Sequence, residues 1–148
     1  LKDNDRTLSV AESCTGGQLG ELITSVPGSS AYFVGGVVAY SNEVKRQQLG
    51  VPKQILVEHG AVSKECAEAM AEGCRRLFES DYALSITGIA GPEGGADDKP
   101  VGTTYIGLSS KHGTCSRQFN FGTLREANRA RACYAALEFL RREILDIK

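Results

Sequence analysis

The fold of this 148-residue chain is decided by the stretch Thr7-Leu8-Ser9-Val10-Ala11-Glu12-Ser13-Cys14-Thr15-Gly16-Gly17. Its first five residues alternate small polar with apolar side chains, a pattern typical of a β-strand. After the paired glycines, apolar residues recur at the spacing of one helix face: Leu19, Leu22, Ile23 and Val26. A strand that turns directly into a helix is the building unit of α/β domains, so the stretch predicts that fold class.

The alternation of strand and helix patterns continues along the chain. Apolar and β-branched runs predict further strands at residues 36–40, 82–87, 102–108 and 114–121. We expect the first of these to be buried and the last two to pair as a hairpin. Helical spacing predicts helices at 43–49, 52–59, 63–78 and from 123 onward. The pattern indicates one layered α/β domain over residues 1–148, with a mixed sheet.

Polar residues mark the starts of the predicted helices. Ser41 or Asn42 precedes the helix at 43–49, and Ser63 precedes the helix at 63–78. Thr123 and Glu126 have the spacing of a capping box at the start of the last helix. We expect the buried face of that helix to consist of Ala127, Ala130, Tyr134, Leu137, Leu140 and Ile144.

Composition narrows the classes of partner. The 17 basic and 18 acidic residues give a formal net charge of −1, which offers no electrostatic basis for nucleic acid as the main partner. No apolar run approaches the roughly 20 residues that span a bilayer, and no secretory leader precedes the first strand. We therefore expect no membrane association and a cytoplasmic location.

Five scattered cysteines, an odd number, form no Cys-x-x-Cys pair, and the chain has only two histidines. These residues give weak support to a zinc site or a disulfide framework. We expect reduced thiols and neither a metal nor a cofactor.

Three segments follow the carboxyl ends of predicted strands, where ligands bind in α/β folds. They are the turn at Ser13, the segment from Tyr40 to Lys45, and the glycine-rich loop after Thr87. We expect them to converge at one edge of the sheet.

The turn at Ser13 favours a nucleophile, because a strand-to-helix junction exposes its side chain. The helix start leaves backbone N–H groups unpaired, and Thr15, Gly16 and Gly17 could present them to an oxyanion or a phosphate. The same pattern also fits a plain helix cap. Cys14 is a rival nucleophile that lacks a visible histidine partner.

A serine needs a neighbouring base, and Lys45 is the candidate because burial can populate its neutral amine. Tyr40 would relay a proton or orient the lysine. A surface lysine beside a half-buried tyrosine is the alternative interpretation. Neither histidine has an obvious connection to Ser13, so the sequence does not favour a Ser-His-Asp triad. Dinucleotide and triphosphate-binding glycine motifs are also absent.

The loop at 88–95 contains more glycine than a turn requires, so its backbone could bind a small polar ligand; a flexible surface segment is the alternative, above all for Gly94 and Gly95. Within it, Gly88, Ala90 and Gly91 are candidates for ligand contact. Arg125 and Arg129 add cations near the start of the last helix, where a phosphate would be stabilised, although a solvated helix face is the alternative.

Five motifs occur together in this order: 11–17 (AESCTGG), 40–45 (YSNEVK), 59–63 (HGAVS), 88–92 (GIAGP) and 99–103 (KPVGT). Together they resemble the CinA C-terminal domain family, which includes nicotinamide-nucleotide amidohydrolases of the PncC type. The resemblance covers nearly the whole chain. It implies a three-layer α/β/α sandwich with a mixed, mostly parallel sheet, and a helix before the first strand of which residues 1–6 would be the end.

The resemblance also implies a function. It suggests a deamidase that converts nicotinamide mononucleotide to nicotinate mononucleotide and ammonia in pyridine nucleotide salvage, without a metal. Ser13 would be the nucleophile, Lys45 the base and Tyr40 the assisting residue, with an arginine of the last helix near the phosphate. The partner would be this small nucleotide, and a homo-oligomer stays open. The alternatives are a non-catalytic nucleotide-binding module of a competence- or damage-inducible protein, and a hydrolase of other small amides.

Overall fold

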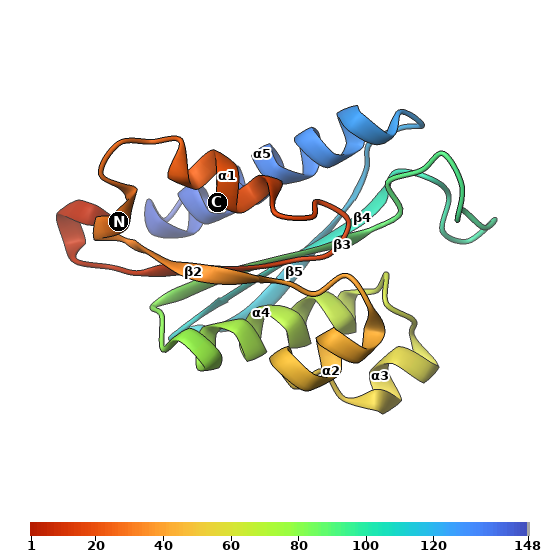
Figure 1. Ribbon diagram of the computed structural model, residues 1–148, viewed down its shortest axis with the longest axis horizontal. Coiled ribbons are helices and arrows are strands. Elements are labelled where there is room, and N and C mark those ends of the chain that lie inside the picture. The colour runs from red at the N-terminus through yellow and green to blue at the C-terminus, as the bar shows by residue number, and fades with distance from the viewer. Residues whose placement is uncertain (148) are drawn as a thin grey trace.

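The computed structural model describes residues 1–147 as a five-stranded sheet between two helical layers (Figure 1). The strands are β1 (Leu8–Glu12), β2 (Phe33–Val38), β3 (Tyr82–Gly88), β4 (Thr103–Ser110) and β5 (Gly113–Asn120). The α-helices are α1 (Gln18–Thr24), α2 (Asn42–Leu49), α3 (Lys53–Glu58), α4 (Lys64–Phe78) and α5 (Arg125–Ile144). Two short 3-10 helices are η1 (Lys2–Asn4) and η2 (Ser29–Ala31).

The sheet is mixed, with the strand order β2-β1-β3-β4-β5. The central strand β1 pairs in parallel with β2 and β3, while β4 runs antiparallel to both β3 and β5. Four of the strands therefore share one direction, and their carboxyl ends lie at the same end of the sheet. The predicted α/β sandwich with a mixed sheet and a final hairpin is confirmed.

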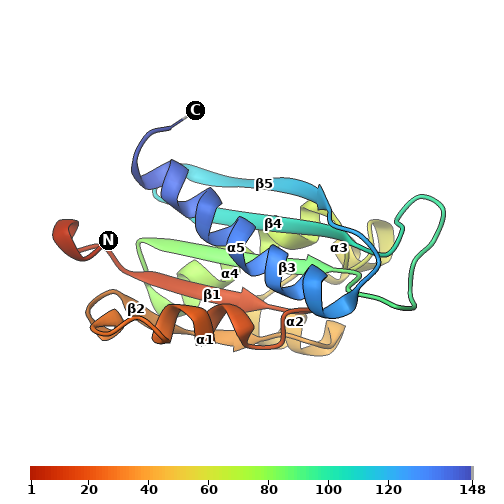
Figure 2. The same cartoon turned by 90° about the horizontal axis from the view of Figure 1, so that it is seen from above.

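The helices divide between the two faces of the sheet. Figure 1 shows α1 and α5 on one face and α2, α3 and α4 on the other, and Figure 2 shows α5 crossing the sheet obliquely. Alternate residues of β1 feed different layers, because successive side chains of a strand point to opposite faces. Leu8 and Val10 pack in the α1/α5 layer, and Ala11 packs in the layer of α4.

The predicted starts of two helices are confirmed. The Oγ of Ser41 accepts a hydrogen bond from the Val44 amide (3.2 Å), and the Oγ of Ser63 accepts one from the Cys66 amide (3.2 Å). The prediction of a buried second strand is wrong. β2 lies at the edge of the sheet, where Val34 is 48% and Val38 is 49% exposed.

The prediction for the start of the last helix is also wrong. Leu124 is its N-cap, and no side chain caps it, so Thr123 and Glu126 form no capping box. Of the predicted buried face, Leu140 is buried, Leu137 and Ile144 are partly buried, and Tyr134 is exposed. The other buried residues of the helix are Asn128, Ala132, Cys133, Ala136 and Phe139. Small residues face the sheet here, so the helix lies close to it and the bulky tyrosine is turned toward solvent.

Gly73 allows α4 to approach the end of α2, and this contact gives a test of the fold. A Cβ at Gly73 would overlap the carbonyl oxygen of Leu49. Intrinsic helix propensity favours alanine over glycine by about 1 kcal/mol, so a loss of stability would have to come from the overlap. We expect Gly73→Ala to lower the free energy of unfolding by about 2–3 kcal/mol in urea titrations. Glu72→Ala, at an exposed neighbouring position, should change it by less than about 0.5 kcal/mol. Equal stability of Gly73→Ala and the parent chain would contradict this packing.

Candidate active site

The three predicted segments meet in a cleft of about 300 Å³ at the carboxyl ends of β1, β2 and β3. Seven of the predicted residues line it: Ser13, Tyr40, Lys45, Gly88, Ala90, Gly91 and Arg125. Four others, Thr15, Gly16, Gly17 and Arg129, do not belong to its wall. They lie behind it, in the turn and in the helix that packs on the turn.

Ser13 and Lys45 form a buried pair at the floor of this cleft. The Lys45 Nζ lies 3.1 Å from the Ser13 Oγ, although the two residues are 32 positions apart in the sequence. Lys45 is 1% exposed and Ser13 is 9% exposed. The lysine reaches inward from α2, and the serine follows β1 directly. A nucleophile and a base are therefore within hydrogen-bonding distance of each other.

Burial lowers the pKa of Lys45 below its ordinary value, because removal from water disfavours the charged ammonium. Nζ also donates to the carbonyl oxygens of Ala39 (2.8 Å) and Tyr40 (3.3 Å). A neutral amine has two hydrogens, one for each carbonyl, and its lone pair is then free to accept the Ser13 hydroxyl proton. The three partners thus suit the neutral form of the lysine.

The start of α1 is occupied by the carboxylate of Glu12. This side chain is 2% exposed and accepts hydrogen bonds from the amides of Gly17 (3.1 Å), Leu19 (3.0 Å) and Gly20 (2.9 Å). The Gly16 amide donates to the Ser13 carbonyl (3.1 Å). Two of the three expected donors, the Gly16 and Gly17 amides, are therefore used within the turn itself. Gly16 and Gly17 have φ values of +58° and +104°, which explains why the turn requires glycine.

The two candidate arginines have different positions. Arg129 donates to the carbonyl oxygens of Cys14 (3.1 Å) and Thr15 (2.9 Å), and so holds the nucleophile turn from behind. Arg125 lines the cleft, where it donates to the Gly91 carbonyl (2.7 Å) and to the Tyr40 hydroxyl (3.2 Å). Only Arg125 of this pair presents its guanidinium to a ligand in the cleft.

Tyr40 contacts Lys45 through its backbone rather than through its hydroxyl. Its carbonyl oxygen accepts from the lysine, while its side chain is 61% exposed and carries the hydroxyl that accepts from Arg125. The tyrosine ring therefore lines the mouth of the cleft beside the arginine. The described contacts include no bond between the tyrosine hydroxyl and the lysine amine.

Several residues of the cleft wall were not among the predicted site residues. They are Asn42, Ala61, Val62, Thr87, Ile89, Glu93 and Gly94. Most of them lie inside or beside the quoted motifs, at positions whose side chains carry no nucleophilic or basic group. Their proximity to the motifs was the one signal in the sequence that could have found them.

Comparisons with known proteins establish the family of the chain. Residues 1–144 match the family model described as CinA C-terminal domain. The chain belongs to this family. A CinA-like protein of Geotalea daltonii is 54% identical over 145 residues, which are 98% of this chain and 35% of that protein. A CinA-like protein of Geobacter sulfurreducens is 50% identical over 145 residues, again 98% of this chain and 35% of the relative. This CinA domain thus spans about a third of the length of these curated relatives.

Solved structures of the family share the fold. The competence damage-inducible protein A of Klebsiella pneumoniae superposes with a TM-score of 0.95 at 34% identity, covering 100% of this chain and 92% of that one. The competence/damage inducible protein of Agrobacterium tumefaciens superposes with a TM-score of 0.92 at 37% identity, covering 94% and 86%.

The other candidate nucleophile of this CinA domain is Cys14. It lines the cleft, but burial raises the pKa of its thiol to about 11, which keeps the thiolate population low near neutral pH. All five cysteines are free. Within residues 1–147, no group of three or more His, Cys, Asp or Glu is arranged to hold a metal ion. Over the same residues, no helix is long and apolar enough to cross a membrane.

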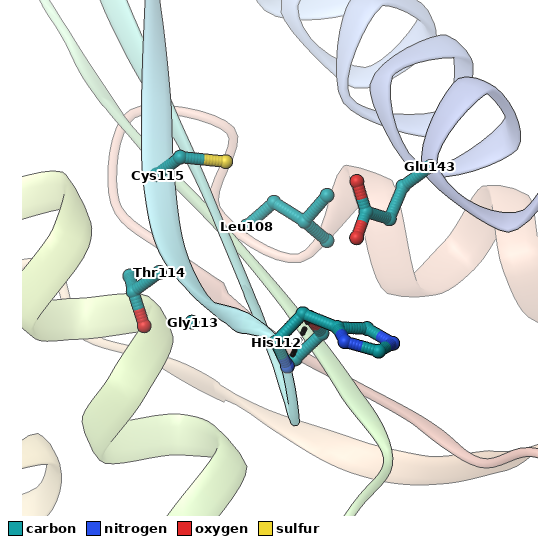
Figure 3. Close-up of a pocket in the computed structure, with 7 residues that line it drawn as sticks. Leu108, His112, Gly113, Thr114, Cys115 and Glu143 are labelled. Carbon is teal, nitrogen blue, oxygen red and sulfur yellow. Dashed lines mark hydrogen bonds between the residues drawn. The ribbon is translucent and has the colours of Figure 1, made fainter. Parts of the chain in front are cut away.

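A second hollow, of about 240 Å³, lies at the opposite end of the sheet, near the turn between β4 and β5. Figure 3 shows Glu143 of α5 and His112 of the turn beside Leu108, with the His112 amide donating to Ser110. Burial raises the pKa of the Cys115 thiol in its wall, so this cysteine is not activated. The hollow contains no residue of the quoted motifs, and the cleft at Ser13 is the candidate active site.

The role of Glu12 in fixing the nucleophile turn can be tested by Glu12→Gln. The amide offers one acceptor oxygen and directs an NH₂ group at backbone donors, so buried N–H groups lose their partner. We expect the free energy of unfolding to fall by about 2–4 kcal/mol in urea titrations. Glu21→Gln, on an exposed position of the same helix, is the matched control and should cost less than about 0.5 kcal/mol. A Glu12 variant as stable as this control would show that the carboxylate does not hold the turn.

Proposed function

We propose that this CinA domain is a nicotinamide mononucleotide deamidase, which hydrolyses the carboxamide to give nicotinate mononucleotide and ammonia. The observation that carries the proposal is the buried contact of 3.1 Å between the Lys45 Nζ and the Ser13 Oγ at the floor of the cleft. A serine and a neutral lysine are sufficient for acyl transfer. The likeness of the five motifs to amidohydrolases of this family suggests the substrate. The reaction would belong to pyridine nucleotide salvage.

The reaction begins when neutral Lys45 accepts the Ser13 proton and the Oγ attacks the carboxamide carbon. The tetrahedral intermediate collapses with cleavage of the C–N bond, and the Lys45 ammonium returns its proton to the leaving nitrogen, which departs as ammonia. Lys45 then activates a water, which attacks the acyl ester and releases nicotinate with regeneration of Ser13. The mechanism uses no metal and no cofactor.

The ligand contacts follow from the residues of the cleft wall. Arg125, oriented by the Tyr40 hydroxyl and the Gly91 carbonyl, would bind the single phosphate through its free N–H groups. Gly88, Ala90 and Gly91, which line the same cleft, would also contact the substrate. Thr15, Gly16, Gly17 and Arg129 would act indirectly, because they shape the turn that carries Ser13.

The Ser13→Ala variant tests the chemistry directly. We expect its release of ammonia from nicotinamide mononucleotide to fall by at least about 10³-fold, while nucleotide affinity measured by calorimetry stays within a few-fold of the parent chain. Lys45→Met should lose most turnover for the same reason. Cys14→Ala keeps the backbone and should stay active, whereas loss of activity there with an active Ser13→Ala would make the thiol the nucleophile.

Two other outcomes would redirect the proposal. Nucleotide binding by the parent chain without any turnover would favour a non-catalytic module, the role that the competence- and damage-related names of its structural relatives leave open. Turnover restricted to other amides would keep the Ser–Lys mechanism and replace the substrate.

The pH dependence of kcat/KM reports the Lys45 base. Lys45 must be neutral to accept a proton, so the rate should rise with pH until the amine is fully deprotonated. Because burial lowers the Lys45 pKa below its ordinary value of 10.5, the midpoint of the rising limb should lie below pH 10.5. A rising limb centred at or above that value would exclude a desolvated lysine as the base.

A further inference from the structure

The peptide between Ala90 and Gly91 is held by a buried side chain outside the cleft. The Nδ2 of Asn128 donates to the Ala90 carbonyl (3.0 Å) and to the Gly122 carbonyl (2.9 Å). Asn128 is 2% exposed, and among residues 1–147 its Oδ1 has no hydrogen-bond partner. An orphaned buried acceptor costs stability, so the asparagine is a poor choice for stability alone. Its NH₂ group serves two carbonyl oxygens at once.

The direction of one carbonyl fixes the direction of the next amide. In a planar trans peptide the C=O and N–H bonds point to opposite sides. The Ala90 oxygen points toward Asn128, which does not line the cleft, so the Gly91 N–H points to the other side of the loop. Ala90 and Gly91 both line the cleft that Ser13 lines. No described residue accepts a hydrogen bond from this amide.

The neighbouring peptides are fixed as well. The Ile89 carbonyl accepts from the Gly102 amide (2.7 Å), and the Gly91 carbonyl accepts from Arg125 (2.7 Å). Three consecutive carbonyls, at residues 89, 90 and 91, therefore have donors. Gly91 has φ +91°, and a Cβ there would come within 2.5 Å of the Val101 side chain. The loop is thus rigid where it faces the cleft, as a site that stabilises a developing charge requires.

The nucleophile turn supplies a matching donor. Cys14 follows Ser13 and lines the cleft, and within the described part of the chain its amide has no backbone acceptor and contacts only its own thiol. Oxyanion holes of serine hydrolases commonly combine the amide after the nucleophile with an amide from a second loop. The α1 amides of Gly17, Leu19 and Gly20 cannot serve, because Glu12 accepts from them.

We propose that Asn128 is a positioning residue, which orients the Ala90–Gly91 peptide so that the Gly91 N–H, together with the Cys14 N–H, donates to the oxyanion formed on attack by Ser13. The proposal rests on the proposed amidase function. It adds a residue of the last helix to those that support the reaction. Asn128 acts by holding the Ala90–Gly91 peptide and does not itself contact the substrate.

Asn128→Ala tests the proposal against a matched variant of the same helix. Arg131→Ala removes a similar bond, from Arg131 to the Phe121 carbonyl (2.9 Å), without touching the loop at residue 90. Because oxyanion donors act in the transition state, Asn128→Ala should lower kcat by about 10- to 100-fold with KM within about threefold. Arg131→Ala should keep both constants within about twofold of the parent chain. Circular dichroism and urea titrations establish that each variant is folded.

An aldehyde analogue separates positioning from general damage. An analogue of nicotinamide mononucleotide with CHO in place of the carboxamide adds the Ser13 hydroxyl across its C=O bond to give a hemiacetal, whose oxygen occupies the oxyanion site. Its affinity should fall in Asn128→Ala by about the same factor as kcat, while affinity for the product nicotinate mononucleotide stays unchanged. Equal losses for analogue and product, or a change in KM alone, would overturn the proposal.

A second variant covers the case in which alanine unfolds the domain. Asn128→Asp keeps the shape of the side chain. The new carboxyl group can donate to one of the two carbonyls when it is protonated and to neither when it is ionised. We expect its kcat, relative to the parent chain, to fall further as pH rises through the titration of the aspartic acid; a ratio of one at high pH would refute the positioning role. If the parent chain itself releases no ammonia, the proposed function fails and this inference fails with it. An active parent and a fully active Asn128→Ala refute the inference alone.

Discussion

The arrangement of the cleft in this CinA domain depends on the burial of the Lys45 amine. Lys45 is 1% exposed, and a buried nitrogen of this kind is tolerated only where it has hydrogen-bond partners or loses its charge. The partners are the carbonyls of Ala39 and Tyr40, just past the end of β2, and the hydroxyl of Ser13, just past the end of β1. The parallel pairing of these strands brings the two ends together, and the cap at Ser41 starts α2 at the place from which Lys45 reaches them. A loss of this arrangement would leave both the amine and the carbonyls without partners.

In the turn at Ser13, two charged side chains pair most of the backbone groups. The Glu12 carboxylate accepts hydrogen bonds from the amides at the start of α1, and the Arg129 guanidinium donates to the carbonyls of Cys14 and Thr15. A helix start is often an anion site, but here the protein supplies the anion itself. The groups left to meet a ligand come from several separate segments of the chain. Specificity in such a site depends on how rigidly those segments are held against one another.

Much of this could be predicted from the sequence, and the exceptions share a physical cause. The strand-to-helix turn at Ser13, the caps at Ser41 and Ser63, and the meeting of Ser13 with Lys45 follow from local spacing and from the rule that carboxyl ends of parallel strands share an edge. The edge position of β2 does not, because strand order is set by pairing between distant segments. The different positions of Arg125 and Arg129 also depend on tertiary contacts, since both occupy similar places in the helix pattern. Asn128 was missed because a polar residue in a helix is ordinarily read as exposed.

The bonds from Arg129 to the turn at Cys14 and Thr15 join residues 115 and 114 positions apart. During synthesis the first strand leaves the ribosome long before the last helix, so the nucleophile turn must wait for most of the chain before its carbonyls acquire their donor. The candidate active site therefore gains these two bonds only when the last helix, α5, packs against the turn. A nascent or truncated chain that has formed β1, α2 and the Ser13–Lys45 pair would still lack the two bonds that hold the turn.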